Sequence, residues 1–239
     1  MTKHVETSPE VARLVERQLQ RWELTRQQHA SFLESGVERK VRDFICISRD
    51  VGSGGAQIGQ ILADRLGWPF FDRQILQTMA GDDQTRKRLY ENLDEHDTSW
   101  LHDMLHWTFE GGWRQDDYFH RLGETVLALS RRSQAIFVGR GVDLILPKHQ
   151  GLRVRVNAPH EFCVHAFAQR LGIAHEQAEM QIRKIEQERA EFLRNHFGKR
   201  VTEASRFDLC LNMGRMTQEQ AVEVVIGTMR VLRMQGAQN

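Results

Sequence analysis

The fold is decided by the stretch Phe44-Ile45-Cys46-Ile47-Ser48-Arg49-Asp50-Val51-Gly52-Ser53-Gly54-Gly55-Ala56-Gln57. Its first four residues form an apolar run that is typical of a buried strand. Residues 58–66 place apolar side chains at helical spacing, and Gly67 stands where a helix C-cap belongs. The glycines in between allow backbone N–H groups to face an anion at the N-terminus of the helix. The stretch therefore predicts a phosphate-binding loop between a strand and a helix.

This loop departs from the Walker A pattern G-x-x-x-x-G-K-[ST] at the residues that act on phosphate. With Gly54 as the second glycine, Arg49 stands at the first, Gly55 at the lysine and Ala56 at the hydroxyl residue. Alone, such a glycine cluster fits a plain strand-to-helix turn as well as a phosphate cradle. The residues predicted to cradle phosphate are Gly52, Ser53, Gly54, Gly55 and Ala56.

The composition is that of a folded chain without a strong overall charge. The 239 residues are 40% hydrophobic, carry a formal net charge of +1 and have a mean hydropathy of −0.53. This length predicts one domain, with room for a helical appendage. A charge so close to zero gives no field that would attract nucleic acid or an anionic membrane, and no apolar run reaches 18 residues. We expect neither nucleic acid nor a membrane as a partner.

The three cysteines, Cys46, Cys163 and Cys210, are far apart in the sequence. Two of them fall in segments predicted to be buried strands. We expect reduced core thiols rather than disulfides or metal ligands. The first residues are polar and lack the apolar core of a signal peptide. These features favour a cytoplasmic protein.

Residues 8–35 are predicted to form one helix, with Ser8 as its N-cap, Pro9 at the first helical position and Gly36 at its end. An apolar stripe on this helix has to be buried against the same chain or against a second copy. We expect a homodimer formed through this helix. The stripe consists of Val11, Leu14, Val15, Leu19 and Trp22.

Strands alternate with helices along the rest of the chain, which predicts an α/β fold with a parallel sheet. The segment 74–131 is mostly helical, with a break at Gly111-Gly112. The last helix begins with a capping box at residues 217–220 and is expected to bury Ala221, Val224, Val225 and Leu232. The predicted strands are 44–47, 68–72, 135–138, 152–156 and 209–211, and further helices are predicted at 160–171 and 175–197.

Three separated blocks resemble the cytidylate kinase-like family of P-loop phosphotransferases. The first runs from Ile47 to Gly55 and continues at Pro69-Phe70-Phe71-Asp72, and the second joins residues 137–141 with 152–159. The third combines residues 185–189, 197–198, 207–209 and 211–212. Together they cover about residues 42–230, and the combination is far more specific than any one block. The N-terminal helix lies outside it.

The resemblance implies a P-loop NTPase fold: a five-stranded parallel sheet flanked by helices, with a helical acceptor insertion and a mobile lid. We expect an N-terminal helical extension over residues 1–40 and the kinase-like domain over residues 41–235. Within that domain, the insertion would span about 74–131 and the lid about 175–203.

The implied chemistry is transfer of the γ-phosphoryl group of ATP, with Mg²⁺, to a cytidylate-like nucleoside monophosphate. Such transfer needs alignment and cations rather than covalent help. We expect Arg49 and Arg189 to stabilise the transferring charge, Asp72 to orient the acceptor, and Arg140 to bind its phosphate. The lid cations are Arg183, Arg194, Lys199 and Arg200, which also fit a solvated helix face with some attraction for phosphate.

Three departures from the family pattern keep other functions open. Family members often have arginine where this chain has Ala56 and Cys163, and aspartate where it has Glu186. A nucleotide-binding sensor or scaffold without turnover is one alternative, with the N-terminal helix as its output element. A kinase of another small metabolite is the second.

The individual residues also have structural interpretations. Arg49 fits an ion pair with Asp50 or another carboxylate, Arg140 fits an unliganded loop, and Arg189 fits a cation that reaches past the edge of the core. Asp72 fits a helix N-cap as well as an acceptor contact. Asp143 fits a helix cap better than a water ligand of Mg²⁺. The helical histidines His96, His102 and His106 lack a further ligand at a recognisable spacing, so we expect no zinc site.

Overall fold

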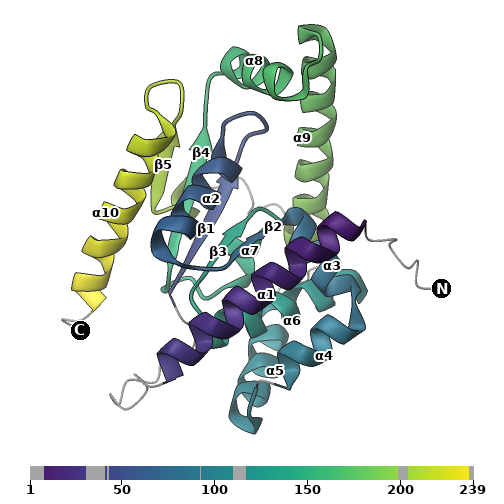
Figure 1. Cartoon of the computed structure of the whole chain (residues 1–239), viewed down its shortest axis with the longest axis vertical. Coiled ribbons are helices and arrows are strands. Elements are labelled where there is room, and N and C mark those ends of the chain that lie inside the picture. The colour runs from purple at the N-terminus through teal and green to yellow at the C-terminus, as the bar shows by residue number, and fades with distance from the viewer. Residues whose placement is uncertain are drawn as a thin grey trace.

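The computed structural model describes residues 8–30, 41, 43–91, 93–109, 117–198 and 204–236. Its centre is a five-stranded sheet in the order β2-β3-β1-β4-β5, in which all neighbouring strands are parallel (Figure 1). The predicted parallel α/β fold is confirmed, and each strand lies where the sequence predicts it. The strands are β1 (Phe44–Arg49), β2 (Phe70–Asp72), β3 (Ala135–Val138), β4 (Leu152–Asn157) and β5 (Leu209–Asn212).

Helices cover the sheet on both faces, as right-handed crossovers between parallel strands require. The helix after the phosphate loop, α2 (Gly55–Leu66), contacts the C-terminal helix α10 (Gln218–Gly236) on one face (Figure 1). The short helix α7 (Val142–Ile145) contacts β1 on the other face. Helix α2 ends at Gly67, whose φ of 71° fits the left-handed C-cap.

The insertion between β2 and β3 is helical, as expected. Its described helices are α3 (Arg73–Gly81), α4 (Asp83–Tyr90), α5 (Glu95–Phe109) and α6 (Asp117–Arg132). The predicted break at Gly111-Gly112 lies outside the described residues, as do the side chains of His96 and His106.

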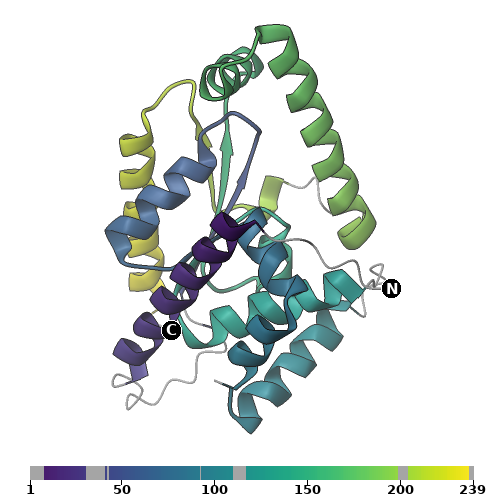
Figure 2. The ribbon, with the colours of Figure 1, turned by 45° about the vertical axis from the view of Figure 1, so that its right-hand side comes forward.

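Two helices, α8 (His160–Leu171) and α9 (His175–Phe197), follow β4 at the predicted positions, and a 3₁₀ turn at Ala204–Arg206 precedes β5. Helix α9 reaches from α8 to the insertion (Figure 2). Near its N-terminus, Ala178 and Ile182 pack with Val51 in a small apolar cluster. Near its C-terminus, the ring of Phe197 lies 4.9 Å from that of Phe119 on α6. The helix is therefore held at both ends.

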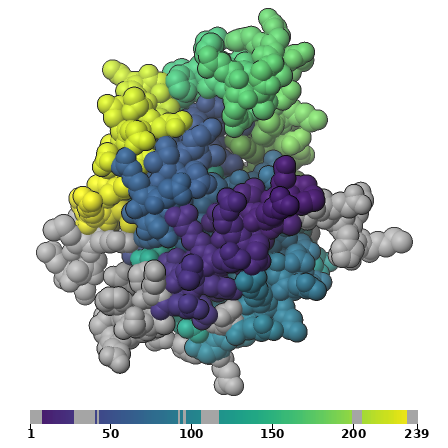
Figure 3. Space-filling view, in the orientation of Figure 1, coloured from purple at the N-terminus to yellow at the C-terminus, as the bar shows by residue number. Residues whose placement is uncertain are grey.

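The N-terminal helix α1 (Pro9–Ala30) packs on α3 of its own chain and lies across the molecule beside α2 (Figure 3). Trp22 is fully buried, and its Nε1 donates to the carbonyl of Leu129 at 2.9 Å. The Gln18 Oε1 accepts a hydrogen bond of 2.8 Å from the N–H of Phe70, on edge strand β2. Of the predicted stripe only Leu14 is exposed, so its burial needs no second copy of the chain. Residues 31–35 of the predicted helix lie outside the described part.

Other details of the core differ from expectation. Cys210 is exposed, because it faces a cleft instead of a covering helix. On α10, Val224 and Leu232 are exposed, and the buried apolar residues are Ala221, Val222, Val225 and Met229. The predicted capping box is confirmed by reciprocal hydrogen bonds between Thr217 and Gln220, of 2.9 and 3.2 Å. No helix in the described part of the chain has both the length and the apolar character to span a membrane.

Candidate functional site

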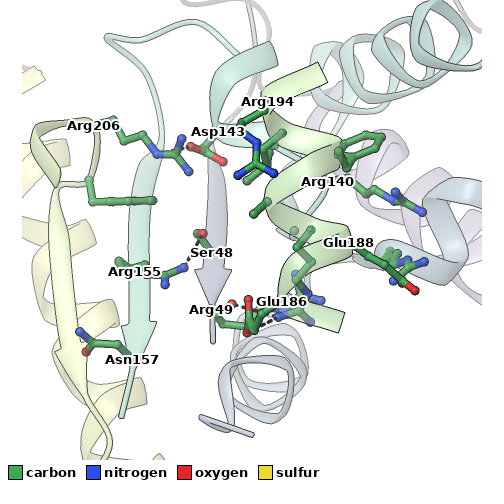
Figure 4. A pocket seen from close by; sticks show the side chains of 18 of the residues that line it. Ser48, Arg49, Arg140, Asp143, Arg155, Asn157, Glu186, Glu188, Arg194 and Arg206 are labelled. Carbon is green, nitrogen blue, oxygen red and sulfur yellow. Dashed lines mark hydrogen bonds and ion pairs between the residues drawn. The ribbon is translucent and has the colours of Figure 1, made fainter. Parts of the chain in front are cut away.

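A cleft of about 820 Å³ lies between α9 and the carboxyl ends of β1, β3 and β4 (Figure 4). Ligands of open α/β sheets bind at this edge. Among the described residues that line it, arginines outnumber carboxylates by seven to three. The arginines are Arg49, Arg73, Arg140, Arg155, Arg189, Arg194 and Arg206, and the carboxylates are Asp143, Glu186 and Glu188.

The phosphate loop lies at one end of this cleft. Only its first residue, Arg49, lines the cleft, and residues 52–56 lie outside the lining. The loop is fixed by Ser53, whose Oγ donates to the carbonyls of Asp50 and Val156 at 2.9 and 3.2 Å. The N–H groups of Gly55, Ala56 and Gln57, in the first turn of α2, have no hydrogen-bond partner among the described residues. They remain available to an anion.

Gly52 has a second reason to be glycine. Its φ is +86°, and a Cβ at this position would lie 2.2 Å from the carbonyl oxygen of Cys163 on α8. Cys163 is itself buried with Val51 in the apolar cluster between the loop and the α8–α9 pair. The loop is thus packed directly against these two helices.

The side chain of Arg49 runs from the loop into the cleft. Its guanidinium lies against Gly139, where a Cβ would be 1.9 Å from Nη1, so that position excludes any other residue. Burial, reinforced by the charge of Arg189, lowers the pKa of Arg49 to about 9. Arg49 forms no ion pair with a described carboxylate; Asp50 instead pairs with Arg155. The interpretation of Arg49 as the partner of Asp50 is therefore wrong.

Arg189 projects from α9 toward the start of the loop. Its Nη1 donates to the carbonyl of Arg49 and to Glu186 Oε1, both at 3.2 Å. Burial lowers the pKa of Arg189, and the nearby Glu186 opposes this effect. The side chain thus faces the cleft and does not reach past the edge of the core.

Arg140 joins the cleft to the insertion. It lies between two glycines and has a φ of 57°, which is uncommon for a residue with a side chain. Its Nη2 donates to Gln77 Oε1 on α3 at 2.8 Å, and its guanidinium lies 4.7 Å from the ring centre of Phe192 on α9. Burial lowers its pKa. It forms no ion pair with any described carboxylate.

The other predicted residues are placed less favourably. Asp72 caps α3, accepting hydrogen bonds from the N–H groups of Gln74 and Ile75 at 2.9 and 3.0 Å, and it does not line the cleft. Arg183 is exposed and pairs with Glu179 at 3.1 Å. Arg194 lines the cleft without an ion pair to a described residue. Lys199 and Arg200 lie outside the described residues.

Asp143 is buried and forms an ion pair of 3.2 Å with Arg206 Nε. Burial raises its pKa, and the charge of Arg206 opposes this shift. The N-cap of α7 is Gly141, with Asp143 inside the first turn. The interpretation of Asp143 as a helix cap is therefore wrong.

Sequence reasoning missed several cleft residues, above all Arg155 and Arg206. Arg155 donates to Ser48 Oγ at 3.1 Å, and both residues face the cleft from neighbouring strands in matching register. The alternation of arginines in β4 was a signal, but an ambiguous one. Arg153, on the same strand face, is buried and donates to five backbone carbonyls between residues 143 and 150.

The described residues contain no group of three or more His, Cys, Asp or Glu side chains that could hold a metal ion. Mg²⁺ commonly binds through one or two carboxylates together with phosphate oxygens and water. The cleft carboxylates are compatible with that limited role, and Ala56 supplies no hydroxyl.

Comparison with protein families gives a match to the cytidylate kinase-like family over residues 44–215. The chain belongs to this family. It is accordingly a member of a kinase-like phosphotransferase family, and α1 precedes the matched region. A search among curated proteins finds no match.

Solved structures share the fold at low sequence identity. An uncharacterized protein from Eubacterium ventriosum ATCC 27560 is 15% identical, covers 79% of this chain and 99% of its own, and has a TM-score of 0.55. A gluconokinase from Sinorhizobium meliloti 1021 is 15% identical, with 84% and 99% covered and a TM-score of 0.44. A shikimate kinase from Acinetobacter baumannii is 16% identical, with 78% and 92% covered and a TM-score of 0.41.

Proposed function

We propose that the protein transfers the γ-phosphoryl group of ATP to a nucleoside monophosphate with a cytidylate-like base. The observation that carries this proposal is the position of Arg49. Its backbone begins the phosphate loop, whereas its buried guanidinium faces the cleft without a carboxylate partner among the described residues. A buried cation is costly unless an anion compensates it, and phosphate is the anion that both neighbouring sites attract.

The donor phosphates would bind at the loop. The N–H groups of the first turn of α2 offer hydrogen bonds, and the positive end of the helix dipole adds to them. Arg49 would replace the missing Walker lysine, because a guanidinium can grip two phosphate oxygens at once. Mg²⁺, held mainly by the phosphates and water, would neutralise charge on the transferring group.

The acceptor would occupy the cleft. Arg140 is suited to its phosphate, because it has a single hydrogen bond to a neutral side chain and no ion pair with a described residue. Arg189 lies between the two sites and would stabilise the group in transfer. Asp72 keeps one oxygen, Oδ1, on the helix cap, and a role in orienting the acceptor is part of the proposal. We also propose that α3–α6 form the acceptor insertion and that the lid includes α9, in a cytoplasmic enzyme.

A nucleotide sensor without turnover is a second candidate, favoured by Cys163. This residue is 3% exposed within an apolar cluster, so no cation projects from its position on α8 toward the loop. Together with Ala56, which lacks a hydroxyl, this leaves the donor side with fewer groups to stabilise transfer.

A ligand screen separates the two candidates. Thermal unfolding and ADP release would be measured with Mg²⁺ and ATP in the presence of each nucleoside monophosphate and a panel of sugar and hydroxy-acid acceptors. The kinase predicts ADP release that depends on one acceptor. Stabilisation by ATP without ADP release for any acceptor would favour the sensor, and release only with a non-nucleotide would reject the cytidylate-like acceptor.

A loop variant tests the donor assignment within the same screen. At Gly54 an added Cβ would meet only Gln218 Nε2, at 3.4 Å, but the φ of +85° disfavours any side chain. Gly54→Val should therefore disturb the loop and abolish ATP binding while the rest of the fold persists, as circular dichroism would verify. Unchanged ATP affinity in the folded variant would reject the phosphate-loop assignment.

A further inference from the structure

Glu186 links the cleft to the phosphate loop through an unusual contact. Its Oε1 accepts a hydrogen bond of 2.5 Å from the backbone N–H of Val51, immediately before the loop glycines. The same oxygen accepts a hydrogen bond of 3.2 Å from Arg189 Nη1. Figure 4 draws Glu186 beside Arg49 at the tip of β1. A carboxylate therefore lies among the groups that attract phosphate.

The position of this carboxylate is set by packing. Ile182, one helical turn before Glu186, packs with Val51 in the apolar cluster, and Gly52 lies against the backbone of Cys163. These contacts hold α9 and the loop in fixed register. Glu186 is nevertheless not locked in the core, because its side chain is 39% exposed and faces the cleft. It can leave the Val51 N–H by rotating its side chain, without any movement of α9.

We infer that Glu186 is an internal competitor of the donor phosphates: it occupies a loop N–H and part of the charge of Arg189, and ATP displaces it. The inference rests on the proposed function of the loop. Carboxylate and phosphate oxygens accept the same charge-assisted hydrogen bonds, and two anions close together repel each other. When ATP binds, the Glu186 carboxylate turns toward the cleft, and Arg189 becomes available to the phosphates.

A purely structural role for Glu186 gives the opposite expectation. If the carboxylate only fastened the loop, weakening this contact would loosen the loop and lower the affinity for ATP. A competitor, by contrast, lowers the affinity while it is present, so its removal raises the affinity. The direction of the change thus separates the two roles.

The experiment compares E186Q with the matched variant E188Q by calorimetric titration with Mg²⁺ and ATP, without an acceptor. Glutamine at 186 keeps an oxygen for the Val51 N–H and removes the charge. Glu188 lines the same cleft from the same helix, is exposed and has no hydrogen-bond or ion-pair partner among the described residues. We expect E186Q to bind ATP about tenfold more tightly than wild type and E188Q to change it by less than about twofold.

The outcomes distinguish this inference from the proposed function. Unchanged or weaker ATP binding by E186Q, with normal binding by wild type, would overturn the competitor and leave the donor site standing. Equal gains in E186Q and E188Q would also overturn it, because the effect would then be a general change of charge. Absence of ATP binding in wild type and in E186Q would overturn both.

Discussion

The cleft has two groups of arginines that differ in their partners. Arg155 and Arg206, near β4 and β5, form ion pairs with Asp50 and Asp143. On the other side, Arg49, Arg73, Arg140 and Arg194 form no ion pair with a described carboxylate. Position in a cleft therefore does not identify a phosphate ligand by itself. The unpaired arginines are the ones that a ligand must neutralise, whereas the paired arginines already have their counter-charge.

Arg189 belongs to neither group, and its removal should have the largest effect on turnover. Arg189→Ala should lower kcat about 100-fold, which corresponds to about 2.7 kcal/mol, because its charge acts mainly on the group in transfer. ATP affinity should change much less. Coupled assays of ADP release, with titration of ATP, measure both quantities. Turnover that is indifferent to this substitution would contradict the assigned role.

Arg140 tests whether the unpaired arginines act on the acceptor. Arg140→Ala should weaken binding of the monophosphate by about 1.5–3 kcal/mol, the range for a hydrogen bond to a charged group, and leave ATP affinity nearly unchanged. The comparison requires separate titrations with each ligand. Equal losses for both would place Arg140 on the donor side or make it structural, through its contact with Gln77.

The low pKa of Arg49 predicts a dependence of stability on pH. Its pKa in the folded protein is about 9, below the ordinary value for arginine. The unfolded chain therefore keeps this proton to higher pH, and the free energy of unfolding should rise as pH increases above about 9. Urea unfolding of wild type and Arg49→Met between pH 8 and pH 10.5 measures the difference, in which other titrating groups cancel. A parallel pH dependence in both proteins would show that Arg49 is not a buried charge.

Arg183 provides the smallest expected effect. It belongs to the predicted lid, but its side chain is 80% exposed and already pairs with Glu179 one turn away. Arg183→Ala should change ATP affinity and kcat by less than about 0.5 kcal/mol. The same assays as for Arg189 apply. A loss comparable to that of Arg189→Ala would mean that the outer face of α9 also closes on the ligand.

Much of the fold could be predicted because it depends on local patterns. Apolar runs, glycines and caps located every strand, and the rule that parallel strands end at one edge brought Arg49 and Arg140 to one cleft. Helix α9 was predicted at its observed bounds, which placed Arg189 correctly.

The pairing of the arginines could not be predicted, because it depends on side chains that meet only in the folded chain. Arg155 lies 105 residues from its partner Asp50, and Glu186 lies 135 residues from Val51. Nothing in the local sequence distinguishes Arg153, which binds backbone carbonyls, from Arg155. The expected dimer had a similar cause. The stripe on α1 was visible in the sequence, but its partner surface on the insertion was not.

The central claim is that Arg49 is a buried cation kept for phosphate, and two quantities measured on Arg49→Met test it directly. Removing an unpaired buried charge should raise the free energy of unfolding at pH 7, by about 1 kcal/mol or more. The same substitution should weaken binding of ATP with Mg²⁺ by roughly two orders of magnitude. A variant that is more stable and does not bind ATP is the predicted result. A variant that is less stable than wild type and binds ATP with unchanged affinity would contradict the claim, because Arg49 would then be a structural residue.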